Sequence, residues 1–81
     1  METNLRREIR AFMRYWLARE AYLDAWAINQ NRAEAARQLP GPLTDGDRAG
    51  LDATAMDARI AKAAYDDARG ALERLLEDPG E

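Results

Sequence analysis

The chain has 81 residues, with 12 basic and 15 acidic side chains, a net charge of −3, and neither cysteine nor histidine. Without these two residue types, disulfides, zinc fingers, thiol nucleophiles and imidazole bases are excluded, and we predict no enzyme activity, no metal and no cofactor. A chain this short has a small core, so self-association or docking on a partner is the expected source of additional stability.

The amino-acid composition favours helices. Seventeen alanines and nine leucines stand against three threonines and no valine. The β-branched residues that favour strands are therefore scarce, whereas strong helix formers are abundant. We predict an all-α fold with one domain spanning 1–81, a helical hairpin of two long antiparallel helices.

The first helix is expected to run from about residue 4 to residue 38. Thr3 or Asn4 can serve as its N-cap. Pro40, Gly41 and Pro42 form the strongest helix-breaking segment of the chain, because a residue before proline is pushed out of the helical region. A loop is therefore predicted at 39–44.

Two apolar stripes run along this first helix. The first stripe contains Leu5, Ile9, Phe12, Trp16, Leu23 and Trp26, and the second contains Met13, Leu17, Ala21 and Ile28. We expect one to pack on the second helix and the other on a second copy, in a four-helix bundle or higher oligomer. The alternative is an exposed apolar surface that receives a different protein, with Trp16 and Trp26 as candidate binding residues.

The second helix is expected over about 45–77, followed by a tail at 78–81. Thr44 is the predicted N-cap, with Asp47 in the acidic position of a capping box. Apolar residues then recur at spacings of three and four, which predicts the face that packs on the first helix. This predicted seam contains Ala53, Met56, Ile60, Ala64, Ala68, Ala71 and Leu75.

Charge is distributed unequally between the two halves. Residues 1–40 carry seven basic and five acidic side chains, and residues 41–81 carry five basic and ten acidic ones. If the hairpin turns near residue 42, residue i lies roughly opposite residue 83 − i. Arg10 would then face Glu73, and Arg6 would face Glu77. We expect the arginines of the first helix to pair with this acidic end.

An alternative use of the arginines is ligand binding. Arg10 and Arg14, together with Tyr15 or Tyr22, could hold an anionic small molecule such as a nucleotide at a subunit junction. Nucleic acid is not an expected partner, because the chain is acidic, with a pI near 4.9, and phosphate neutralisation dominates such binding.

The segment Leu5-Arg-Arg-Glu-Ile9 resembles the opening of the first helix in the all-helical chorismate mutases, which are small intertwined helical dimers. This resemblance implies a third alternative, an enzyme that grips a dicarboxylate with arginines and a lysine. The acidic residues that the family has just after Ile9 and Phe12 are Arg10 and Met13 here. The sole lysine, Lys62, is on the second helix and a third helix is missing, so no catalytic role is transferred.

Neither a signal peptide nor a transmembrane span is predicted, because Arg10, Arg14 and Arg19 interrupt the apolar residues near the N-terminus. A cytoplasmic location is expected. Eleven arginines against one lysine is typical of GC-rich genomes. The preferred hypothesis is a small non-enzymatic interaction or inhibitor protein, encoded by a phage or mobile element, that binds a macromolecular partner.

Overall fold

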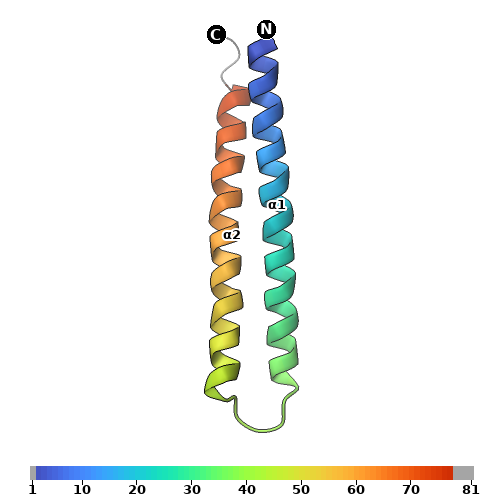
Figure 1. The fold of residues 1–81 in the computed structure, drawn as a ribbon, viewed down its shortest axis with the longest axis vertical. Helices are drawn as coiled ribbons and strands as arrows, with labels where there is room; N and C mark the ends of the chain where they lie inside the picture. The colour runs from blue at the N-terminus through green and yellow to red at the C-terminus, as the bar shows by residue number, and fades with distance from the viewer. Residues whose placement is uncertain (1, 78–81) are drawn as a thin grey trace.

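In a computed structural model, the chain is an all-α helical hairpin. The structure describes the backbone of residues 2–77 and the side chains of residues 5–77. Helices α1 (Glu2–Arg37) and α2 (Asp45–Glu77) lie side by side and run in opposite directions (Figure 1). The molecule is a rod measuring 62 × 15 × 13 Å. Neither described helix contains a stretch apolar enough to cross a bilayer.

The predicted helix boundaries are close to the observed ones, except at the start of α1. This helix already includes Glu2, so Thr3 and Asn4 lie inside it and the predicted N-cap is wrong. At its other end the last turn tightens, with the amides of Gln38 and Leu39 bonding to carbonyls three residues back. The loop then passes through Gly41, whose φ of +84° is a left-handed conformation that glycine adopts without a steric penalty. The predicted tail at 78–81 lies outside the described residues.

The predicted capping box starts α2. The amide of Asp47 donates a hydrogen bond of 3.1 Å to Thr44 Oγ1, and the Thr44 amide donates one of 3.0 Å to Asp47 Oδ2. These reciprocal bonds satisfy two backbone donors at the helix start. The backbone bond from Thr44, followed by its hydroxyl, lowers the pKa of Asp47 below the ordinary value of 3.8.

Replacing Thr44 with alanine should lower the free energy of unfolding by about 1 kcal/mol. The alanine cannot accept the bond from the Asp47 amide, which is then left to water. Urea denaturation followed by circular dichroism would measure the loss. Thr44→Ser keeps the accepting oxygen and should remain within a few tenths of a kcal/mol of the parent; an equal loss in both variants would contradict the capping role.

The contact surface between the helices, here called the seam, follows a seven-residue repeat. The buried and half-buried residues of α2 include a series at alternating spacings of four and three: Asp47, Leu51, Thr54, Ala58, Ala61, Tyr65, Ala68, Leu72 and Leu75. The half-buried residues that match them on α1 are Ala11, Tyr15, Ala18, Tyr22, Ala25, Asn29, Ala33 and Ala36. This period of 3.5 is that of two helices wound around each other as a coiled coil.

The predicted seam of α2 is therefore correct only near its C-terminal end. Ala68 is buried and Leu75 is half-buried, but Met56 and Ile60 are 52% and 62% exposed, and Ala53 and Ala64 are exposed as well. The predicted residues follow the straight-helix period of about 3.6. Contacts between coiled helices repeat every 3.5 residues instead, so the two patterns coincide near residue 68 and diverge away from it.

Neither predicted apolar stripe of α1 forms the seam. Large members of both stripes remain exposed, and a third face, rich in alanine, packs on α2. The expectation that one stripe would cover α2 is thus wrong. Alanine at eight of the seventeen seam positions allows close approach of the two helices, which leaves the bulky side chains of α1 on the outside.

A polar contact between Asn29 and Thr54 crosses the seam and shows its register. The Thr54 hydroxyl, in a side chain that is 7% exposed, lies 3.1 Å from Asn29 Oδ1, to which it can donate. The same hydroxyl lies 3.1 Å from the Leu51 carbonyl and 3.3 Å from the Gly50 carbonyl, so three acceptors compete for one proton. Residues 29 and 54 sum to 83, which confirms the predicted register of the hairpin.

Ala68 is the most deeply buried side chain, with 1% of its surface exposed. Replacing it with leucine should cost about 1 to 3 kcal/mol of unfolding free energy, because the added atoms must push the helices apart. Ala64→Leu makes the same change one turn earlier on an exposed surface and should be nearly neutral. Urea denaturation of the two variants would measure the difference, and equal stabilities would show that the seam is not tightly packed at Ala68.

Candidate functional site

The largest exposed apolar surface of the described residues lies on α1, and we call it the α1 patch. It consists of Leu5, Ile9, Phe12, Met13, Trp16, Leu17, Leu23 and Trp26. Their exposed fractions run from 41% for Leu23 to 66% for Leu17. The patch combines the first predicted stripe with Met13 and Leu17 of the second, and their spacings of three and four place these side chains on one broad side of the helix. Such contiguous apolar surface typically marks an interaction site.

A shallow hollow lies in the middle of this patch. Phe12, Met13, Trp16 and Leu17 surround a volume of about 340 Å³. All four come from two consecutive turns of one helix, so the hollow depends on the shapes of their side chains alone. Its lining has no hydrogen-bonding side chain other than the indole of Trp16, and it therefore fits an apolar side chain better than a polar ligand.

Charged side chains border the patch near Trp16. The Arg19 guanidinium lies 5.6 Å from the centre of the Trp16 ring, within the range of a cation–π contact. The same guanidinium lies 3.6 Å from the Glu20 carboxylate. Both partners of this ion pair are exposed, so it contributes little to folding stability. It gives the apolar surface a polar edge of the kind found around protein interfaces.

The two tyrosines predicted to bind a ligand lie in the seam instead. Tyr65 of α2 packs between Tyr15 and Tyr22 of α1, with ring centroids 5.5 and 5.7 Å apart. The Tyr22 and Tyr65 rings are stacked, with an interplanar angle of 15°. Polar contact with the Tyr15 side chain, followed by partial burial, raises the pKa of Tyr65 above its ordinary value of 10.0. Tyr65 was not among the predicted site residues, although it lies on the seven-residue repeat of the seam.

Arg10 and Arg14 are exposed one turn apart on α1, and the structure does not join them to the tyrosines. Tyr15 projects about 100° away from Arg14 around the helix. The expected pairs Arg10–Glu73 and Arg6–Glu77 do not form among the described side chains. Glu73 instead accepts a 3.0 Å hydrogen bond from Arg69 on its own helix, because a partner one turn away reaches it with less side-chain ordering.

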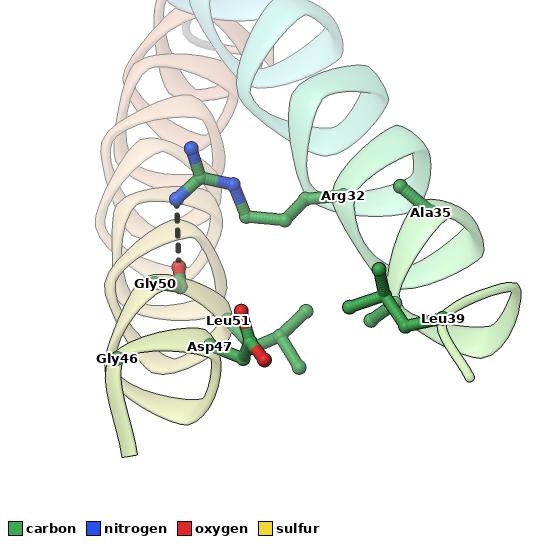
Figure 2. A pocket seen from close by; sticks show the side chains of 8 residues that line it. Arg32, Ala35, Leu39, Gly46, Asp47, Gly50 and Leu51 are labelled. Carbon is green, nitrogen blue, oxygen red and sulfur yellow. Dashed lines mark hydrogen bonds between the residues drawn. The ribbon is translucent and has the colours of Figure 1, made fainter. Parts of the chain in front are cut away.

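A second hollow, of about 350 Å³, lies where the helices separate beside the loop. Figure 2 shows the Arg32 side chain extending from α1 toward α2, where its guanidinium donates a 3.3 Å hydrogen bond to the Gly50 carbonyl. A β-carbon at position 50 would lie 2.9 Å from that guanidinium, so glycine leaves room for the arginine. The Asp47 carboxylate already accepts a backbone amide bond at the start of α2, which disfavours binding of another anion here.

Comparisons with known proteins do not add to this description. No family model matches the chain, and no curated protein and no solved structure gave a significant match. We therefore infer the function from the surfaces of the hairpin. Of the four residues predicted to hold an anionic ligand, the structure places Tyr15 and Tyr22 in the seam and Arg10 and Arg14 apart from them. Trp16 and Trp26, the candidate residues for binding another protein, lie on the α1 patch.

Proposed function

We propose that this chain is a small non-enzymatic interaction protein that binds another polypeptide through the α1 patch. The observation that carries the proposal is the exposure of eight large apolar side chains on one helix, while alanine is the most frequent residue of the hairpin seam. Inhibition of the bound protein and an origin in a phage or mobile element belong to the same hypothesis.

More large apolar side chains are exposed on the α1 patch than are buried between the two helices. The described side chains include one apolar residue, Ala68, that is fully buried, so the hairpin by itself removes little apolar surface from water. Covering the α1 patch would remove much more. Tryptophan is also among the residues most enriched at the hot spots of protein interfaces, and Trp16 and Trp26 are both in this patch.

The nucleotide and chorismate mutase alternatives have no comparable support. Tyr15 and Tyr22 are engaged with Tyr65, and no described feature places them with Arg10 and Arg14 around a common cavity. The segment that resembles the mutases contributes Leu5 and Ile9 to the apolar patch. These alternatives therefore remain without an observation that favours them.

Tryptophan fluorescence tests the proposal, because Trp16 and Trp26 are the only tryptophans of the chain. If the patch binds a polypeptide, the emission should shift to shorter wavelength and become less quenchable by acrylamide as the complex forms. Light scattering on the same samples would give the mass of the complex. Tryptophans that stay accessible in every complex the protein forms would refute the patch as its binding surface.

A further inference from the structure

We propose that a second copy of this chain covers the α1 patch, with the two α1 helices packed antiparallel across a two-fold axis near residue 14. This inference rests on the proposed function, since it names the occupant of the same surface. It gives a four-helix assembly in which the α1 helices make the central contact and each α2 lies outside its own α1.

The spacing of the patch residues along α1 favours packing against a second helix. Its side chains fall into two series with a seven-residue repeat, one with Leu5, Phe12 and Trp26, the other with Ile9, Trp16 and Leu23. The Arg19 position completes the first series. Together they alternate by four and three, the pattern of a coiled-coil seam. The helix therefore carries a second seam, distinct from the one that α2 occupies.

Antiparallel packing of two α1 helices brings apolar residues of the two copies into contact. When two such seams pack antiparallel, residue i lies roughly opposite residue 28 − i of the second copy. Leu5 then meets Leu23, and Phe12 meets Trp16, each contact occurring twice by symmetry. The hollow between Phe12, Met13, Trp16 and Leu17 lies at the two-fold axis, where a self-complementary surface is required. An apolar side chain of the second copy can fill it.

The charged residues in and beside the second seam favour antiparallel over parallel packing of the two α1 helices. Arg6, Met13 and Glu20 occupy one flank of the second seam at seven-residue intervals. In the antiparallel arrangement, flank residues lie beside partners about two positions away from the seam relation of 28 − i. Arg6 then lies beside Glu20 of the second copy, and Met13 lies beside Met13. A parallel arrangement would instead place Arg19 directly against Arg19 in the seam, where two like charges repel each other. Arg19 meets Ile9 in the antiparallel form and can extend toward solvent.

The available area is sufficient for a stable dimer. With side-chain areas on the order of 150 to 250 Å² for aromatic residues, half-exposure of eight large side chains leaves roughly 800 Å² per chain. Specific interfaces typically bury about 800 Å² per partner. The seam series extends from Leu5 to Trp26, on the order of 30 Å of helix, so one straight helix of a second copy can cover it.

Site-specific cross-linking tests the register directly, because the natural chain has no cysteine. Met13→Cys should be converted to a covalent dimer by a short bismaleimide, since residue 13 lies beside its own copy near the axis. Ala27→Cys is the matched control on the same flank. In the antiparallel dimer the two residues 27 lie about 40 Å apart and should not cross-link. Equal cross-linking of both variants would indicate a parallel dimer and overturn the inference.

A charge exchange provides a second test with the same chain. Arg6→Glu should raise the dissociation constant of the dimer about tenfold, because two attractive pairs become repulsive. Arg6→Glu combined with Glu20→Arg restores opposite charges and should recover most of the affinity. Loss of affinity in the double variant as large as in the single one would contradict the pairing.

The outcomes separate this inference from the proposed function. A chain that is monomeric at all concentrations and does not cross-link at residue 13 refutes the second copy as the occupant. If such a monomer still binds another protein with burial of Trp16 and Trp26, the proposed function stands. If the monomer binds nothing through the patch, both proposals fail.

Discussion

Replacing Trp16 with alanine should abolish self-association while leaving the hairpin folded. Trp16 is 49% exposed in the single chain, so its removal costs the isolated fold at most about 1 kcal/mol. In the two-fold dimer each Trp16 meets Phe12 of the other copy, and both contacts are lost together. Truncation of a central aromatic hot spot typically costs about 2 to 4 kcal/mol, so the dissociation constant should rise at least roughly thirtyfold.

Light scattering over a concentration series would measure this change, with circular dichroism reporting helix content. Ile60→Ala is the matched control, because Ile60 is also a large exposed apolar residue but lies on α2, outside the α1 patch. This variant should keep the mass of the parent. A Trp16→Ala protein that loses its helical signal at concentrations where the parent is monomeric would show that Trp16 belongs to the folding core.

Replacing Tyr65 with alanine is the change with the largest expected effect on folding. Tyr65 contacts two aromatic rings of α1 at once, and no other described residue joins the helices through two ring contacts. Removing a packed aromatic residue typically costs about 3 to 5 kcal/mol when it is fully buried. Because Tyr65 is half-buried, we expect about 2 to 3 kcal/mol, with the aromatic contacts contributing about 0.5 to 1.5 kcal/mol each.

Urea denaturation of a monomeric background such as Trp16→Ala would isolate this effect from dimerisation. Tyr65→Phe keeps both ring contacts and should lose less than about 1 kcal/mol. Leu76→Ala removes an exposed apolar residue of the same helix and should be nearly neutral. Equal losses for Tyr65→Ala and Leu76→Ala would contradict the role of the tyrosine cluster in holding the helices together.

The substitutions of Trp16 and Tyr65 affect contacts on different surfaces of α1. Tyr15 and Tyr22 face α2, whereas Trp16 and Leu23, each one residue further along the chain, face away from it. Neighbouring residues on a helix differ by about 100° in direction. The helix can therefore present the tyrosines of the seam to α2 and the α1 patch to a partner. Stability of the hairpin and association through the patch should therefore be separable by mutation.

The local features were predictable from the sequence because they depend on residues close together in the chain. Alanine and leucine content favoured helices, Pro40 and its neighbours placed the turn, and the Thr44–Asp47 capping box set the start of α2. The register followed from the position of that turn, as the Asn29–Thr54 contact shows. The start of α1 was not predicted, since Thr3 can cap a helix but can equally lie within one.

The amino-acid sequence by itself thus determined two long helices, where they end and how they align. Only the tertiary structure decided which faces meet. The hydrophobicity of the bulky residues of α1 predicted that they would form the packing face. The helices instead pack through alanine and tyrosine, because small side chains allow close contact over a long coiled seam. That choice leaves Trp16 and Trp26 exposed and places Tyr15 and Tyr22 against Tyr65, so these two tyrosines face α2 rather than Arg10 and Arg14.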